Sequence, residues 1–440
     1  MASDCPAEQL VEIRSLAQGG HGVATSADGR TLFVPGTVPG DRLRCRITEV
    51  RRRYLRGQLV ELVQSGPERI VPQCRHFGDC GGCDWQMLAY ADQCRYKQQL
   101  LQQTCAHRLG AAVAECLEPL LASETAFGYR SRAQLKAHAA GGAFALGFYR
   151  RGSHFVVDVQ DCPLLAAPLR ALLAPLRQLF AGTSYAAWVP QIDVATDDAG
   201  AIRLLVHYRG EDLAAFCRWL QPRLAALAVA GPLAVLVQAG RKARIRLLCG
   251  EPQLRIRVDE PPLWLAYGPG GFAQVHLAQN RALVARLLDW AAVQPSDQVL
   301  DLYCGMGNFT LPLARRAARV TGVEDYAPSI EAARANARET GLAARTVFEV
   351  AATADCLSRL TAAPDLVVLD PPRSGAYEAV AGLVRLRPSR LVYVSCDPQT
   401  LLRDLVPLLG QGYDLLRLGA LDLFPQTHHT EVVALLQARG

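Results

Sequence analysis

In the C-terminal part of the chain, short apolar runs alternate with amphipathic segments. Five runs, at residues 299–303, 319–323, 346–350, 366–369 and 391–394, are each followed by a segment of helical composition. This alternation predicts a parallel, doubly wound α/β sheet. Two further strands at 413–418 and 431–436 have only a loop between them, so we expect an antiparallel hairpin that completes a seven-stranded Rossmann-like domain.

The first 65 residues show a different pattern, with short alternating strands at 10–13, 31–34, 43–50 and 57–63 separated by glycine turns. Such strands predict a small β-barrel. Residues 88–121 have helical composition, and residues 125–262 are mostly β with helices near 164–180 and 213–228. We therefore expect a barrel at 1–66, a central α+β domain at 67–92 and 125–262, and an α/β domain at 263–440 that is joined by the helical segment 93–124.

Composition and charge narrow the class of protein. Half of the 440 residues are apolar, no basic-then-apolar signal stands at the N-terminus, and no stretch is long and apolar enough to span a membrane. A soluble cytoplasmic protein is expected. The net charge is a modest +6, but the predicted barrel concentrates arginines around Tyr54, including Arg51, Arg52 and Arg53. Clustered arginines with an aromatic among them favour contact with nucleic-acid phosphates over a merely solvated edge.

Fourteen cysteines without an export signal indicate metal binding or chemistry rather than disulfides. Cys74, Cys80 and Cys83 are interleaved with glycines, and Cys162, followed by a proline, comes about eighty residues later. Glycines let a chain wrap around an inorganic core, and a final Cys-Pro is typical of iron–sulfur ligation. From spacing alone zinc stays open, and either Cys94 or Cys105 could replace Cys162 as the fourth ligand.

A glycine turn follows the first strand of the predicted α/β sheet and contains Gly305 and Gly307. Such glycines let backbone amides approach a ligand, and Glu324, at the end of the second strand, is placed to bind ribose hydroxyls. The turn lacks the full G-x-G-x-x-G pattern that cradles a pyrophosphate. A nucleoside ligand without phosphates, such as S-adenosylmethionine, therefore fits better than a dinucleotide.

Candidate catalytic residues follow the later strands. Asp370 begins an Asp-Pro-Pro-Arg segment whose prolines are expected to hold its carboxylate in a rigid cleft. Cys396 precedes a helix start, whose amide dipoles should lower the thiol pKa and favour a nucleophilic thiolate. The predicted hairpin returns Glu431 to the same sheet edge as a potential general base. His428 and His429 are alternatives for that role.

These motifs together resemble the RNA uracil-C5 methyltransferases over nearly the whole chain. The barrel is similar to the family's TRAM domain, and the Ser-Cys396-Asp-Pro and His-His-Thr-Glu431 segments resemble its nucleophile and base motifs. The resemblance implies a 4Fe-4S cluster on the cysteines Cys74, Cys80, Cys83 and Cys162. It also implies S-adenosylmethionine contacts from Gln274, Tyr303, Asn308, Glu324 and Asp370. The segment after the third strand, residues 350–353, is nearly apolar, and an adenine contact there stays unassigned.

The resemblance further implies how the protein acts. The thiolate of Cys396 adds to carbon 6 of uracil, carbon 5 takes the methyl group, and Glu431 removes the carbon 5 proton. Arg130 and Arg132 are additional candidates for RNA contact.

The family's branches differ in their N-terminal parts. We expect tRNA-specific enzymes to lack both barrel and cluster and another ribosomal branch to lack the barrel. Possession of both thus implies an enzyme acting on uracil 1939 of 23S ribosomal RNA. Separately, we expect a monomer with no DNA or membrane partner. The alternatives are methylation of another ribosomal or transfer RNA uridine, methylation of an RNA cytosine, and a non-catalytic iron–sulfur protein that binds RNA during ribosome assembly.

Overall fold

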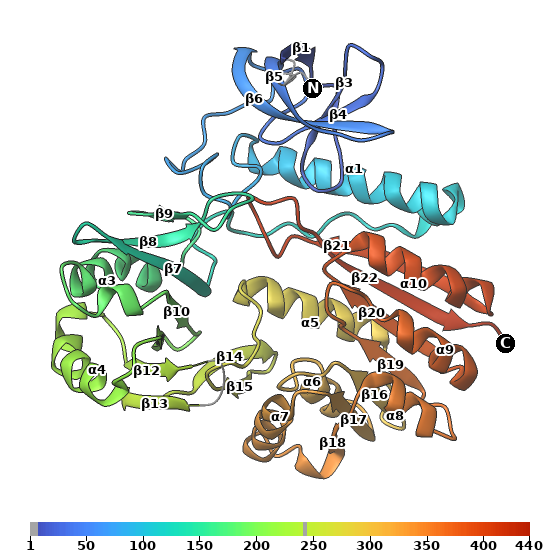
Figure 1. Cartoon of the computed structure of the whole chain (residues 1–440). Helices are drawn as coiled ribbons and strands as arrows, with labels where there is room; N and C mark the ends of the chain where they lie inside the picture. Colours follow the sequence, from blue (N-terminus) through green and yellow to red (C-terminus); the bar gives the residue numbers. More distant parts are fainter. Residues whose placement is uncertain (1–7, 241–243) are drawn as a thin grey trace.

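The computed structural model describes residues 8–240 and 244–440, which form three large sheets and one two-stranded sheet (Figure 1). The N-terminal sheet has the strand order β1-β5-β6-β4-β3-β2. Its strands are β1 (Glu8–Glu12), β2 (Ser15–Leu16), β3 (Gly22–Thr25), β4 (Thr31–Val34), β5 (Arg42–Val50) and β6 (Tyr54–Gln64). Alternate positions such as Leu32, Leu43 and Leu55 are buried, which explains the period-2 pattern of the sequence. The four predicted strands are confirmed, and β2 and β3 were not predicted.

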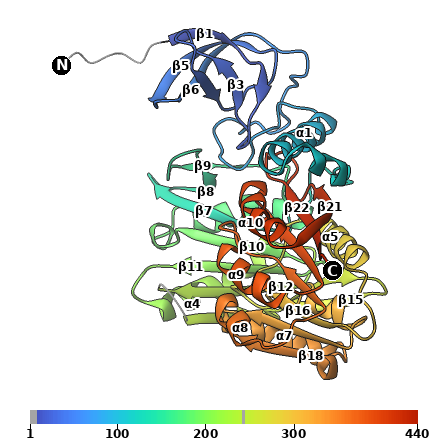
Figure 2. The ribbon, with the colours of Figure 1, turned by 90° about the vertical axis from the view of Figure 1, so that its right-hand side faces the viewer.

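Helix α1 (Tyr90–Leu109) connects this sheet to the rest of the molecule (Figure 2). Its Tyr96 and Leu100 pack in one apolar cluster with Leu16 and Val38 of the N-terminal region. The predicted continuation of the helix to residue 121 is wrong, because Gly110 adopts a left-handed φ of 88° and ends it. A 3₁₀ turn, η1 (Ala111–Cys116), follows, and the chain then runs beside the last sheet instead of forming helix.

The central sheet has the order β13-β12-β11-β10-β7-β8-β9. Its strands are β7 (Arg132–Ala140), β8 (Ala143–Tyr149), β9 (Val156–Asp158), β10 (Gln191–Thr196), β11 (Ile202–Tyr208), β12 (Leu233–Ala239) and β13 (Arg244–Cys249). The helical elements of this region are α2 (Ala167–Ala171), α3 (Leu173–Phe180), η2 (Ala186–Trp188), α4 (Leu213–Leu220) and η3 (Gln221–Leu227). Stacked aromatic rings of Tyr208 and Phe216, 4.2 Å apart, help join α4 to the sheet. The two-stranded sheet of β14 (Leu254–Asp259) and β15 (Leu263–Tyr267) was not predicted.

The C-terminal sheet has the order β18-β17-β16-β19-β20-β22-β21. Its strands are β16 (Gln298–Leu302), β17 (Arg319–Glu324), β18 (Thr346–Val350), β19 (Leu366–Leu369), β20 (Arg390–Ser395), β21 (Tyr413–Leu421) and β22 (Glu431–Ala438). The helical elements here are α5 (Leu277–Ala291), α6 (Thr310–Ala314), α7 (Ala327–Glu339), η4 (Ala343–Arg345), α8 (Thr353–Arg359), α9 (Tyr377–Leu386) and α10 (Pro398–Gly410). The first five strands are parallel, and β22 is antiparallel to both neighbours. The predicted doubly wound sheet with its terminal hairpin is confirmed.

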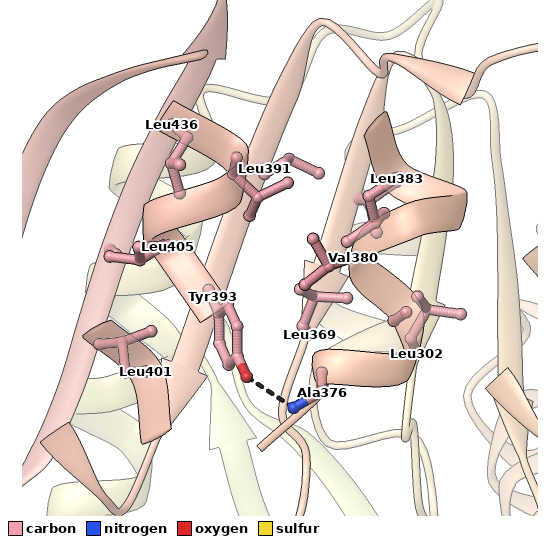
Figure 3. Packing of buried hydrophobic residues seen from close by; sticks show 14 of the residues in the cluster. Leu302, Leu369, Ala376, Val380, Leu383, Leu391, Tyr393, Leu401, Leu405 and Leu436 are labelled. Carbon is pink, nitrogen blue, oxygen red and sulfur yellow. Dashed lines mark hydrogen bonds between the residues drawn. The ribbon is translucent and has the colours of Figure 1, made fainter. Parts of the chain in front are cut away.

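Apolar side chains cover the face of this sheet that packs against α9 and α10 (Figure 3). Leu101 and Cys105 of α1 join the same core, although they lie far away in the sequence. Tyr393 places its hydroxyl inside this core, where it accepts from the backbone N–H of Ala376 at 2.9 Å and donates to Asp404 at 2.7 Å. This satisfied polar contact fixes the chain just after the Asp370 loop. In the described residues, none of the helices has the length and apolar character required to cross a bilayer.

Candidate active site

A cavity of about 40 Å³ lies at the carboxyl ends of β16 and β19. It brings together five of the residues predicted to contact a cofactor, Gln274, Tyr303, Gly305, Asn308 and Asp370. Glu324 lies next to it, because its carboxylate accepts from the backbone N–H of Gly305 at 3.3 Å. Gly307 completes the turn with a φ of 97°, a conformation that favours glycine. The predicted set therefore converges on one site.

The side chains of Tyr303 and Asn308, which both line this cavity, differ in their hydrogen bonding. Tyr303 has a φ of 62°, and its buried hydroxyl finds no hydrogen-bond partner among the described residues. Asn308 has its amide satisfied instead, through two hydrogen bonds of 2.9 and 3.0 Å with Asn280. An unsatisfied buried hydroxyl is costly, so the Tyr303 site fits a polar ligand that supplies the missing contact.

Three carboxyl groups meet at the sheet edge. Burial raises the pKa of Asp370 to about 7 and the pKa of Asp301 to about 7. Burial also raises the pKa of Glu324, and the charges of Asp370 and Glu324 both disfavour ionisation of Asp301. Neighbouring carboxylates repel each other unless a cation compensates. A positive charge at this site would be stabilised, and the sulfonium of S-adenosylmethionine carries such a charge.

Cys396 and Glu431 come to the same edge through the hairpin. Strand β22 runs antiparallel to β20, with Val432 opposite Ser395, so Glu431 begins its strand beside the Cys396 turn. The carboxyl of Glu431 is buried, and this burial raises its pKa well above the usual range. Its charge also raises the pKa of Cys396. The structure thus brings Glu431 and the Cys396 turn to one edge of the sheet, and their catalytic roles stay predictions.

The expected lowering of the Cys396 pKa by the helix start is wrong. Burial, followed by repulsion from Glu431, raises the thiol pKa to about 11. At the start of helix α10, the carboxylate of Asp397 caps the helix and accepts from the N–H groups of Gln399 at 2.8 Å and Thr400 at 3.3 Å. These two N–H groups therefore donate to Asp397 and not to the thiol of Cys396.

Arg373 ends the Asp-Pro-Pro-Arg segment that begins with Asp370, and no role was predicted for it. Its guanidinium lies near the thiol and favours the ionised forms of both Cys396 and Glu431. It therefore offsets part of the rise that burial causes in the pKa of each group. It also lies 3.3 Å from Nε2 of His429. The position of this arginine after a strand end was a signal that could have identified it.

The two alternatives for the base are held in other contacts. Nδ1 of His428 lies 2.7 Å from a carboxylate oxygen of Asp84, in the cysteine-rich segment of residues 74–84. Burial lowers the pKa of His429 to about 4, with a further contribution from His428. Both histidines thus stand at the junction between the cysteine-rich segment and the C-terminal sheet.

The four predicted cluster ligands, Cys74, Cys80, Cys83 and Cys162, line one cavity. Burial raises the pKa of Cys83 to about 12, although Gln86 donates to its sulfur at 3.1 Å, and the other three thiols raise it further. Of the other two candidates, Cys105 belongs to the C-terminal core and Cys94 lies on α1. Within residues 8–240 and 244–440, however, no group of three or more His, Cys, Asp or Glu side chains has an arrangement that could hold a metal ion. The iron–sulfur cluster is therefore not confirmed by the geometry.

The candidate RNA-binding arginines lie in two places. Arg51, Arg52 and Arg53 are exposed at the turn between β5 and β6. Arg130 and Arg132 line a larger cavity of about 480 Å³ with Lys136 and Arg203. Arg130 also lines the cysteine cavity, and Phe272, which is 63% exposed, lines both the basic cavity and the cofactor cavity. The basic cavity therefore adjoins both the cysteine cavity and the cofactor cavity.

Comparisons with known proteins agree with this architecture. The family model described as tRNA (Uracil-5-)-methyltransferase matches residues 96–439, and the TRAM domain model matches residues 7–60. A protein of Alkalilimnicola ehrlichii named 23S rRNA (uracil(1939)-C(5))-methyltransferase RlmD is 40% identical over 97% of this chain and 96% of its own length. One of the same name from Shewanella sediminis is 35% identical over 98% of this chain and 96% of its own length.

A solved structure has a similar fold over nearly the whole chain. The tRNA (uracil-54, C5)-methyltransferase of Pyrococcus abyssi, in complex with S-adenosyl-L-homocysteine, has a TM-score of 0.76 at 24% identity and covers 97% of this chain and 100% of its own. Its fold includes the N-terminal region, so the expectation that tRNA-specific enzymes lack the barrel is wrong. The family model covers well over half of the chain and the relatives match it nearly end to end, so the chain belongs to the tRNA (Uracil-5-)-methyltransferase family and begins with a TRAM domain.

Proposed function

We propose that this enzyme transfers a methyl group from S-adenosylmethionine to carbon 5 of uracil 1939 in 23S ribosomal RNA. The observation that carries the chemistry is the convergence of Cys396 and Glu431 beside the cofactor cavity. The target is supported by relatives of 35–40% identity that bear this name over nearly the full length of the chain. The fold alone does not distinguish a ribosomal from a transfer RNA target, because an enzyme named for tRNA has a similar fold.

The residues of the cofactor cavity fit the donor. Glu324 is placed to bind its ribose, and Tyr303 has a buried hydroxyl in need of a partner. Gln274 and Asp370 line the wall of the cavity and would hold the reacting groups in line. When bound, S-adenosylmethionine supplies the methyl group.

Carbon 5 of uracil is too weak a nucleophile to be methylated directly, so the ring needs covalent activation. The thiolate of Cys396 adds to carbon 6 and generates an enolate at carbon 5. Arg373 partly offsets the rise in the pKa of Cys396 that burial causes, and so increases the fraction of thiolate. After methylation, the carboxylate of Glu431 takes the carbon 5 proton, and the bond between sulfur and carbon 6 breaks to regenerate the thiolate.

RNA reaches this site from the basic cavity in our proposal. Arg130 and Arg132 bind phosphates or unstacked bases next to Phe272, and Arg51, Arg52 and Arg53 of the TRAM domain contact the RNA backbone. The target uridine leaves its stack to reach Cys396, as enzymes that act on a base require. A monomer in the cytoplasm is the form that we expect to act.

We further propose that the cysteine cavity holds a 4Fe-4S cluster on Cys74, Cys80, Cys83 and Cys162. The proposal is supported by the four thiols that line one cavity and by the N–H donor that Gln86 directs at Cys83. Iron and acid-labile sulfide should be found in protein purified without oxygen and should be lost in Cys83→Ser. Zinc in the anaerobic protein, with no sulfide, would contradict the cluster.

The decisive experiment for the reaction is transfer of tritiated methyl groups to 23S RNA that lacks the modification, followed by mapping of the labelled nucleotide. We expect 5-methyluridine at position 1939. Label at another ribosomal uridine, in transfer RNA or on cytosine would redirect the substrate assignment. Failure to bind S-adenosylmethionine would favour the non-catalytic alternative.

A further inference from the structure

The loop of residues 422–430 between β21 and β22 is irregular yet mostly buried, and Glu431 follows it directly. Polar backbone groups of a buried loop must find partners within the protein. Here most of these partners come from segments more than 290 residues earlier in the chain. One is Tyr129, whose hydroxyl donates to the carbonyl of Pro425 at 3.0 Å.

Gln426, in the middle of this loop, is held by Gln93 of α1. The side-chain oxygen of Gln93 accepts from the backbone N–H of Gln426 at 2.9 Å, and its amide group donates to the Gln426 side chain at 2.9 Å. The carbonyl of Gln426 in turn accepts from the backbone N–H groups of Asp84 at 3.0 Å and Trp85 at 3.1 Å. Gln426 has a φ of 71°, a conformation that non-glycine residues keep only when surrounding contacts impose it.

Lys97, one turn further along α1, holds the start of the loop. Its ammonium group donates to Asp422 at 2.7 Å and to the carbonyl of Phe424 at 3.2 Å. The side chains of Lys97 and Asp422 are both completely buried. The same oxygen of Asp422 also accepts from the backbone N–H of Phe424. One face of α1 thus determines the path of the loop at two points.

We infer that Gln93 and Lys97 are positioning residues for Glu431, because they fix the loop that leads directly into β22, of which Glu431 is the first residue. Neither residue lines the cofactor cavity. The inference rests on the proposed role of Glu431 as the base. A displaced base should slow removal of the carbon 5 proton, and therefore release of the covalent protein–RNA adduct, more than it affects donor binding.

The test compares Gln93→Leu with Gln98→Leu in the full-length protein. Gln98 is a matched control on the same helix, because its amide donates to the carbonyl of Glu118 at 3.2 Å and not to the loop. We expect adduct release to slow by about 10- to 100-fold in Gln93→Leu, with an unchanged KM for S-adenosylmethionine, and to be normal in Gln98→Leu. Adduct is measured on denaturing gels with labelled RNA, and Tm is measured for both variants.

The outcomes separate this inference from the proposed function. Adduct release at the wild-type rate in folded Gln93→Leu, or equal slowing in both variants, would overturn the positioning role. If Gln93→Leu does not fold, the double variant Lys97→Met with Asp422→Leu replaces it, since no unpaired charge remains buried. An absence of any adduct in Glu431→Gln would overturn the base assignment itself.

Discussion

The two sides of the active site are built in different ways. Cys396 stands between β20 and α10, and its turn is fixed by neighbours such as Asp397, which caps the helix within four residues. Glu431 stands at the end of a buried loop that is held by Gln93 and Lys97, more than 320 residues earlier in the chain. The turn of Cys396 is therefore fixed by local structure, whereas the loop before Glu431 depends on contacts with residues far away in the sequence.

This difference separates two physical requirements of the reaction. The nucleophile needs an accessible sulfur whose ionisation can be tuned by nearby charges, and a strand–turn–helix unit provides this. The base must lie on the side of the ring where the proton leaves. This placement requires correct packing between segments that are far apart in the sequence. Changes on the Cys396 side should therefore alter reactivity, and changes on the Glu431 side should alter geometry.

The largest effect is expected from Cys396→Ala. Without the thiol no covalent activation of carbon 6 takes place, and methyl transfer should fall below detection while the fold and donor binding are retained. Tritium incorporation into unmodified 23S RNA measures the loss. Methylation by this variant at the wild-type rate would contradict covalent catalysis by Cys396.

Glu431→Gln tests the opposite side and should fail at a later step. Methyl transfer can still occur, but the carbon 5 proton stays in place, so methylated RNA should remain attached to Cys396. We expect turnover to fall by about 10²- to 10⁴-fold, the usual contribution of a general base. A denaturing gel detects the adduct. Methylated RNA released freely by this variant would move the base role to another group, with His429 the next candidate.

The same division explains what the sequence could predict. Apolar periodicity identified the parallel strands and the hairpin, and strand-end positions identified Asp370 and Cys396. The sequence did not indicate that Asp397 would take amide donors from the Cys396 side, because capping and thiol activation compete for the same N–H groups. It also gave no hint that Lys97 and Gln93 reach the last loop, since this pairing exists only after α1 packs on the C-terminal core.

Lys97→Met measures how much the buried ion pair between α1 and the 422–430 loop contributes to stability. The variant leaves Asp422 buried without its partner, and such a change typically costs about 3–5 kcal/mol of the free energy of unfolding. Denaturant unfolding followed by circular dichroism gives the value. Adding Asp422→Leu should recover much of the loss, because both charges are then gone. A single variant as stable as the wild type would show that the pair contributes little to the contact between α1 and the loop.

Arg373→Gln should act on reactivity through charge. Arg373 favours the ionised forms of Cys396 and Glu431, so its removal raises both pKa values and leaves less of each active form at neutral pH. The rate at pH 7 should fall by on the order of tenfold, and the rising limb of the pH–rate profile should move to higher pH. Arg385→Gln is the control, because Arg385 donates to the carbonyl of Leu360 instead. An unshifted profile with a lower rate would indicate a binding role for Arg373.

The smallest effect is expected at Asp397 and tests why the thiol pKa is high. Asp397→Ala removes the cap of α10 and should cost about 1 kcal/mol of stability. It also frees the N–H groups of Gln399 and Thr400 and removes a negative charge beside the sulfur, so the pKa of Cys396 should fall from about 11. The rate of alkylation by iodoacetamide as a function of pH reports this pKa. Asp397→Asn keeps the cap without the charge, and a fall in Asp397→Ala alone would assign the effect to the helix start. An unchanged pKa in both variants would mean that burial and the charge of Glu431 determine the pKa of Cys396. The helix start would then have no measurable effect on the thiol.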